Sequence, residues 1–157
     1  MVYYKLINSY SGREVMSENV FQAGTNLVII SHPHKGDGVN GRSICAEIRR
    51  KLEGTTGQVC LYHDASAMST ANTAYAGEFK TLDKEISSRV IEVVCAIPGS
   101  IPRMMAHTVA MLSDKKWSIF KTADEATAYL TKMGYTFSAS AGARSAAGSA
   151  VSLKVLR

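Results

Sequence analysis

The chain has 157 residues, of which 46% are hydrophobic and 20% are charged, enough apolar material for one packed domain. No stretch reaches the roughly 18 apolar residues of a membrane-spanning helix, and the N-terminus lacks a signal-peptide layout, so we expect a cytoplasmic protein. The formal net charge of +5 favours anionic partners. Nucleic-acid binding is nevertheless not expected, because the eighteen basic residues are scattered without interleaved aromatic residues.

In the first half of the chain, short β-branched and aromatic runs alternate with turn residues before a helical period begins. Ile44, Ile48 and Leu52 recur every four residues, which predicts an amphipathic helix that Gly54 ends. The glycines between Pro33 and this helix predict a flexible loop. The predicted elements are a hairpin of strands 2–7 and 15–21, strands 26–30 and 58–62, and a helix over 43–53.

In the second half, helical and strand patterns continue to alternate. Tyr75, Phe79 and Leu82 share one helix face, and the charged residues between 78 and 85 are expected to cover the solvated side. Thr122 and Glu125 fit a capping box at the start of the last helix, which carries Ala126, Tyr129 and Leu130 inward and ends at Gly134. The other predicted elements are a helix within 71–89, a central strand over 91–97, a helix capped by Ser100 with Met105, Val109 and Leu112 on one face, and a strand over 117–121.

This order of elements predicts an α/β sandwich in which a mixed, mostly parallel sheet packs with about four helices. Residues 137–157 begin with a run of serine, alanine and glycine that has too little apolar surface to offset its ordering entropy, so we expect a flexible tail there. The folded domain would then occupy residues 1–136. Cys45, Cys60 and Cys95 lie among apolar neighbours without C-x-x-C spacing, which predicts reduced thiols in the core.

A glycine pattern follows the predicted strand 26–30. Gly36, Gly38 and Gly41 form a G-x-G-x-x-G sequence, and Asp64 ends the next predicted strand, where a dinucleotide site places its ribose-binding acid. Residues 31–35 separate the strand from the first glycine, whereas that fingerprint needs a tight turn directly after the strand. We therefore favour a connecting loop and keep a nucleotide site as the alternative.

Histidines and nucleophiles give no diagnostic catalytic or metal pattern. His32 and His34 alternate and would point the same way on an extended backbone, where Asp37 or His63 could join them in a metal site. Neither of these has a diagnostic spacing for a third ligand. We expect His32 and His34, like His107, to be surface groups, with no metal and no cofactor. No G-x-S-x-G elbow is present, and apolar surroundings raise the pKa of a cysteine thiol, so enzyme activity is not expected.

The segment 63–72 joins a predicted strand to the long helix and concentrates polar side chains. Its candidate site residues are Asp64, Ser66, Ser69, Thr70 and Asn72. A hydroxyl at a helix N-terminus caps free amides when unmodified, and when phosphorylated it places a dianion where those amides favour negative charge. The segment is therefore either a simple cap or a switch on a surface that binds a protein partner.

The order of elements and two stretches of sequence resemble STAS domains, and within them the SpoIIAA-like (STAS/SEC14-type) branch. The first stretch, 60–68, reads CLYHDASAM, and the second, 117–130, reads WSIFKTADEATAYL. The helix through Phe79 and Leu82 and the strand 90–97 lie between them. The resemblance extends over residues 2–133 in element order.

This resemblance implies a non-enzymatic regulatory domain related to anti-sigma-factor antagonists, which bind a kinase or another signalling protein and are switched by phosphorylation at an Asp-Ser-Ser-Gly-like turn. The matching turn here reads Ser69-Thr70-Ala71-Asn72, so Thr70 would be the acceptor with Ser69 beside it. The likeness to the lipid-binding SEC14 fold implies, as the alternative, a lipid in an apolar crevice near Met68, Met104 and Met105. A homodimer is left open.

Overall fold

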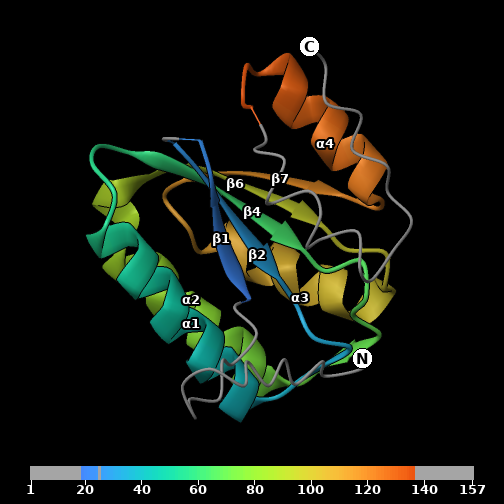
Figure 1. The fold of residues 1–157 in the computed structure, drawn as a ribbon. Helices are drawn as coiled ribbons and strands as arrows, with labels where there is room; N and C mark the ends of the chain where they lie inside the picture. Colours follow the sequence, from blue (N-terminus) through green and yellow to red (C-terminus); the bar gives the residue numbers. More distant parts are fainter. Residues whose placement is uncertain (1–18, 25, 137–157) are drawn as a thin grey trace, which may run out of the picture.

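The computed structural model describes residues 19–24 and 26–136. A five-stranded sheet with the order β1-β2-β4-β6-β7 forms its centre (Figure 1). The first strand runs antiparallel to the second, and the remaining neighbours are parallel. The strands are β1 (Val20–Ala23), β2 (Leu27–Ser31), β4 (Val59–Asp64), β6 (Val90–Ala96) and β7 (Lys116–Phe120). The predicted mixed, mostly parallel sheet is confirmed.

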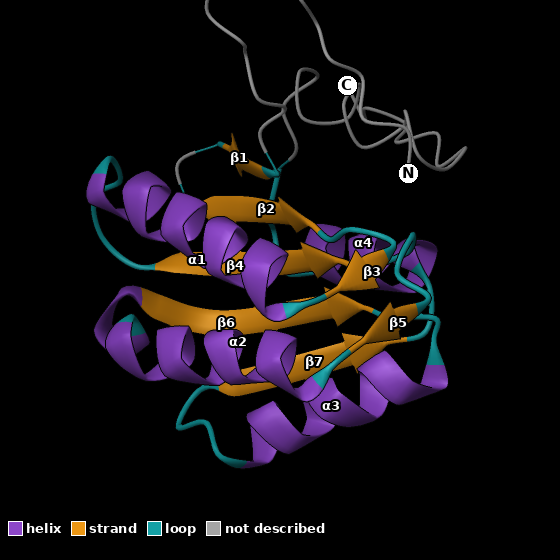
Figure 2. Ribbon diagram, turned by 90° about the horizontal axis from the view of Figure 1, so that it is seen from below, coloured by secondary structure: helices purple, strands orange, loops and turns teal. Residues whose placement is uncertain are grey.

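Four α-helices lie on the two faces of the sheet, three on one side and one on the other. They are α1 (Gly38–Glu53), α2 (Thr73–Glu85), α3 (Ser100–Met111) and α4 (Ala123–Lys132), and a short 3-10 helix, Ser87–Arg89, follows α2. In Figure 2, α1, α2 and α3 lie in front of the sheet and α4 behind it. Within the described residues, no helix combines the length and the apolar character needed to span a bilayer.

Alternating strand residues supply two separate apolar cores, because successive side chains of a strand point to opposite faces. On the three-helix side, Ile30, Leu61 and Val93 pack with Ile48 and Leu82. On the α4 side, the sheet packs against helix residues that include Ala126 and Leu130. The strand β6 lies between β4 and β7 and is buried on both faces, as its apolar sequence predicts.

A second, two-stranded sheet lies where the main parallel strands end. Its strands are β3 (Lys35–Gly36) and β5 (Thr70–Ala71), which pair in parallel with Lys35 opposite Thr70. Figure 2 shows both beyond the arrowheads of the main sheet. This pairing ties the segment after β2 to the segment after β4, so the two connections at this edge form one surface.

Several predicted boundaries differ from the structure. The residues 2–7 and 15–18 of the predicted hairpin lie outside the described residues, and the described hairpin joins β1 to β2. The loop predicted before residue 43 is wrong, because α1 begins at Gly38 behind an Asp37 N-cap. The N-cap of α3 is Gly99 instead of Ser100, and Leu112 at its end is exposed. The predicted tail, 137–157, lies outside the described residues.

The thiols and the last helix agree with the sequence-based expectations. Cys45, Cys60 and Cys95 are buried free thiols. Burial raises the pKa of Cys45 and of Cys60 to about 12 and raises that of Cys95 further, so none is poised as a nucleophile. The Thr122 side chain accepts from the Glu125 amide at 3.2 Å, which confirms the capping box.

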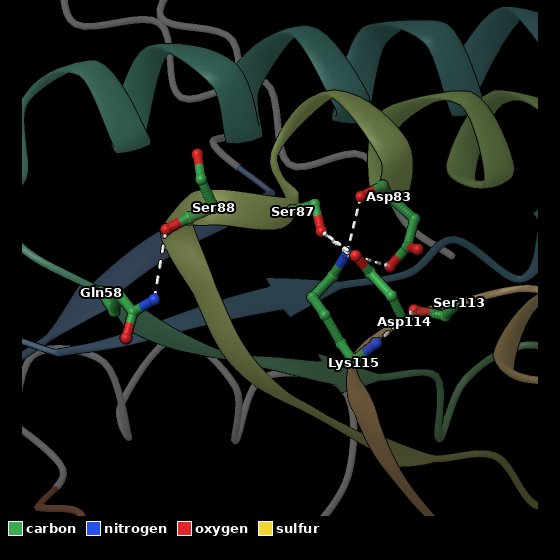
Figure 3. A network of polar contacts seen from close by, with 7 residues as sticks. All are labelled: Gln58, Asp83, Ser87, Ser88, Ser113, Asp114 and Lys115. Carbon is green, nitrogen blue, oxygen red and sulfur yellow. Dashed lines mark hydrogen bonds and ion pairs between the residues drawn. The ribbon is translucent and has the colours of Figure 1, made fainter.

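A buried ion pair connects the end of α2 to the turn before β7 (Figure 3). Lys115 Nζ lies 3.0 Å from Asp83 Oδ1 and donates to the Asp83 carbonyl at 2.6 Å. Both side chains are at least nine-tenths buried. Ser87 and Asp114 complete the cluster, because the Ser87 hydroxyl contacts both Asp114 carboxylate oxygens at 2.8 Å. The prediction that Asp83 covers a solvated face is wrong.

Candidate functional site

A cavity of about 70 Å³ lies between the sheet and the helices α2 and α3. Its walls are almost entirely carbon, and they come from β4, β6 and β7, both helices and the segments that precede them. The residues that matter for the argument are His32, His63, Met68, Tyr75, Met105 and Trp117. The cavity has room for several waters or for a small organic molecule, since one water needs about 10–15 Å³.

Two histidines and a tyrosine form a hydrogen-bonded chain at this cavity. His32 Nδ1 contacts the Tyr75 hydroxyl, and His32 Nε2 lies 2.8 Å from His63 Nδ1. The chain is assembled by the sheet, because Ile30 is the register partner of His63 and the His32 amide donates to the Asp64 carbonyl at 2.9 Å. His32 and His63 are each 7% exposed, so the prediction that His32 is a surface group is wrong.

Aromatic rings surround the two imidazoles and keep them neutral. The His63 ring stacks on Trp117 at 6.4 Å between centroids, and Phe79 contacts both histidine rings. Burial lowers the pKa of His32 to about 3. Burial, and secondly the neighbouring His32, hold the pKa of His63 well below its usual range. Burial also raises the pKa of the Tyr75 hydroxyl, so all three groups are uncharged at neutral pH.

The segment between β4 and α2 is held by short-range hydrogen bonds. Asp64 Oδ1 accepts from the Ser66 amide at 3.0 Å and from its hydroxyl at 2.6 Å. Ser69 Oγ lies 3.1 Å from His34 Nε2, and His34 Nδ1 donates to the Ala67 carbonyl at 3.0 Å. The exposed His34, which lies between β2 and β3, therefore holds the segment between β4 and α2 in place through these two contacts.

The structure assigns the helix cap to a residue other than the two hydroxyls proposed for it. Asn72 is the N-cap of α2, and its side-chain oxygen accepts from the Tyr75 amide at 2.9 Å. The simple capping role considered for Ser69 or Thr70 is wrong. Thr70 lies in β5 and is exposed, and within the described residues its hydroxyl has no hydrogen-bond partner.

The glycine pattern serves helix packing and capping. A Cβ on Gly36 would lie 2.8 Å from Tyr75 Cγ, and one on Gly41 would lie 2.9 Å from Tyr75 Cδ2. Gly38 is the first residue of α1, and the Asp37 carboxylate accepts from the Val39 and Asn40 amides at 2.9 Å. These amides are the ones that a phosphate at the helix N-terminus would use. The nucleotide alternative gains no support from these contacts and stays a prediction.

Replacing Gly36 with alanine tests the close approach of the Tyr75 ring. We expect the free energy of unfolding to fall by about 1–3 kcal/mol, because the new methyl group overpacks a ring that is itself hydrogen-bonded to His32. The matched control is Gly77→Ala in the exposed part of α2, where a Cβ meets nothing within 4 Å and should stabilise by about 0.5–1 kcal/mol. Urea unfolding measures both, and equal effects would contradict this account.

Comparison with known proteins bears on the fold. The structure is similar to that of an uncharacterized protein of the DUF3478 family, with a SpoIIAA-like fold, from Shewanella loihica PV-4. The TM-score is 0.54 and the sequence identity 11%, over 71% of this chain and 90% of that chain. The chain has a SpoIIAA-like fold. The resemblance predicted from the sequence is thus confirmed at the level of architecture. No family model and no curated protein matches the sequence.

In this SpoIIAA-like fold, the candidate residues form two groups. Ser69, Thr70 and Asn72 lie on the loop between β4 and α2, outside the cavity, whereas Met68 and Met105 line the cavity. Met104 is 63% exposed and is not among the lining residues. Sequence reasoning considered His63 with His32 only as a possible metal site, and it missed their burial and the part played by Tyr75. The signal that groups the two histidines is their place at the carboxyl ends of adjacent parallel strands, His63 near the end of β4 and His32 directly after β2.

Proposed function

We propose that the protein is a regulatory domain that binds a protein partner through the loop before α2 and the start of α3. The observation that carries the proposal is an exposed hydroxyl beside exposed apolar side chains at one edge of the sheet. Thr70 is exposed in β5, and Ile101 and Met104 in α3 are 57% and 63% exposed. Exposed apolar patches mark interaction sites, and a phosphate added beside one would change the charge that a partner meets.

These residues belong to one surface because α3 packs beside β5. At the start of α3, a Cβ on Gly99 would lie 3.5 Å from the Met68 carbonyl oxygen, so the helix begins against the loop that carries Ser69 and Thr70. We call this surface, made of Ser69, Thr70, Asn72, Ile101 and Met104, the loop face. Its polar and apolar parts would contact the same partner.

Thr70 is the hydroxyl of the loop face best placed for phosphorylation. The Ser66 hydroxyl is engaged by Asp64 and that of Ser69 by His34, whereas Thr70 has no such contact within the described residues. Its register partner across the small sheet is the exposed Lys35, so a phosphate on Thr70 would lie beside an ammonium group. Modification would change the charge of the loop face without disturbing a buried contact.

The test is the affinity of the partner for Thr70 variants. A photo-crosslinking residue at Thr70, with one at the exposed Thr56 as the matched control, captures the partner that contacts the loop face. We expect Thr70→Glu and Thr70→Ala to shift the Kd of that partner in opposite directions, by about tenfold between them, because a charge at a docking face changes complementarity. Equal affinities for the two variants would contradict the proposed switch at Thr70. Equal capture of the partner by the crosslinker at Thr56 would contradict the assignment of the binding surface to this loop.

The cavity favours a second candidate function, the binding of a small ligand between the sheet and the helices. Met68 and Met105, two of the three methionines predicted to form an apolar crevice, line it. Nearly all of the lining is apolar, which fits an uncharged ligand better than a nucleotide.

A further inference from the structure

Within the part of the chain that the structure describes, two ring nitrogens of cavity-lining residues make no hydrogen bond, Nε2 of His63 and Nε1 of Trp117. His63 lines the cavity, and its Nδ1 is engaged by His32. Within residues 19–24 and 26–136, its Nε2 has no hydrogen-bond partner, although the side chain is more than nine-tenths buried. The neighbouring Trp117 has a buried Nε1–H that is also unpaired in this part of the chain. A fully buried unpaired atom such as Trp117 Nε1 costs about 1–3 kcal/mol. His63 Nε2 is the unpaired nitrogen next to it, and a ligand in the cavity that pairs with it adds a hydrogen bond that the protein does not make.

The hydrogen-bonded chain decides what His63 Nε2 can pair with. If the Tyr75 hydroxyl donates to His32 Nδ1, His32 carries its proton on Nε2 and donates to His63 Nδ1, which leaves the proton of His63 on Nε2 as a donor. If each bond is reversed, His63 Nδ1 donates and Nε2 becomes an acceptor. Both arrangements keep every ring neutral, so the ligand atom at His63 Nε2 selects between them.

We propose that the cavity binds a small neutral molecule with one oxygen, an alcohol or a ketone, whose oxygen pairs with His63 Nε2. The inference rests on the ligand-binding candidate above and adds the polar group that is recognised. The carbon part of the ligand would contact the Met68, Met105 and Ala106 walls. A volume of about 70 Å³ fits a ligand of a few heavy atoms better than a whole acyl chain. A carboxylate is excluded because its charge would be buried among neutral groups.

The test uses butanone as the probe at pH 7.5 and follows the histidine nitrogens by NMR of the full chain labelled with ¹⁵N. We expect a saturable change in which His63 Nε2 becomes fixed as the protonated nitrogen, because a ketone oxygen only accepts. The indole N–H signal of Trp117, the one tryptophan in the sequence, should shift with the same saturation curve. The hydrocarbon of the same shape, 2-methylbut-1-ene, should bind about five- to tenfold more weakly, and propanoate should give no saturable change.

Two variants of α3 complete the experiment. Ala106→Leu fills the cavity from its wall and should abolish the saturable shifts, whereas Met111→Leu, at the exposed end of the same helix, should leave them unchanged. Equal affinity for butanone and the hydrocarbon would overturn the inference while keeping the ligand-binding candidate. The absence of saturable binding by either probe would overturn both. Binding that survives Ala106→Leu, with that variant folded, would overturn the assignment to this cavity.

Discussion

Replacing Lys115 with methionine is expected to lower the free energy of unfolding by about 3–5 kcal/mol, the largest effect predicted for this protein. The substitution leaves the Asp83 carboxylate buried without its counter-ion, and it removes the donor that contacts the Asp83 carbonyl. Urea unfolding of the wild type and of Lys115→Met measures the difference. The double variant Asp83→Leu with Lys115→Met should regain much of the loss, because no uncompensated buried charge remains and Asp114, the other carboxylate beside Lys115, is exposed to water.

The matched control for this prediction is the exposed ion pair between α1 and α2. Arg49 and Glu85 lie 2.7 Å apart, but their side chains are 37% and 47% exposed. Arg49→Met should therefore cost at most about 1 kcal/mol, since exposed pairs gain little in water. A loss from Lys115→Met no larger than the loss from Arg49→Met would show that the buried pair does not hold α2 to the turn before β7.

Acidification is expected to destabilise the protein well before most carboxylates are protonated. His32 titrates near 6.5 when unfolded and near 3 when folded, so the unfolded state binds the extra proton between these values. Its contribution is unchanged above pH 6.5, and stability falls as the pH drops from 6.5 toward 3. Between pH 8 and pH 5, His32 alone should remove about 2 kcal/mol of unfolding free energy. His63, whose pKa is also lowered, acts in the same direction.

Chemical unfolding at several pH values between 8 and 5 checks this expectation. His32→Gln should make the pH dependence shallower even if it lowers stability at every pH, since the slope counts protons and is independent of the absolute stability. The exposed His107→Gln is the control and should leave the slope as it is in the wild type. A flat profile in the wild type would mean that the folded and unfolded states take up the same number of protons over this range, so that folding does not lower the pKa of the histidine pair.

The sequence predicts an element well where the spacing of apolar residues within that one helix or strand is enough to define its buried face. The faces made by Ile44, Ile48 and Leu52 in α1 and by Tyr75 and Leu82 in α2 are buried as their spacing predicts. The start of α1 was missed because Gly38 and Gly41 lower helix propensity and because its capping box uses Asp37 and Asn40 instead of the common serine and glutamate. The hydrogen bonds that the Asp37 cap makes outweigh the low helix propensity of the two glycines.

The candidate site was harder to predict because its members come from distant parts of the chain. His32 and Tyr75 are separated by 43 positions, and the ring contact between them depends on the pairing of β2 with β4 and on the placement of α2. The burial of Asp83 has the same cause, since its partner Lys115 comes from another turn. The periodic pattern of a single element does not show whether a polar residue has a partner far away in the chain. Asp83 and His32 were therefore expected to be exposed to solvent.

The pairing of β3 with β5 bears on the association rate and on the ordering free energy of the complex proposed for the loop face. Because Lys35 and Thr70 are already fixed in register, the loop face needs little ordering when another molecule contacts it. Fixing the backbone of one residue typically costs about 1–2 kcal/mol, and this small sheet removes part of that penalty beforehand. The complex proposed for the loop face should therefore form as a rigid-body encounter, with the association rate set by diffusion and charge steering.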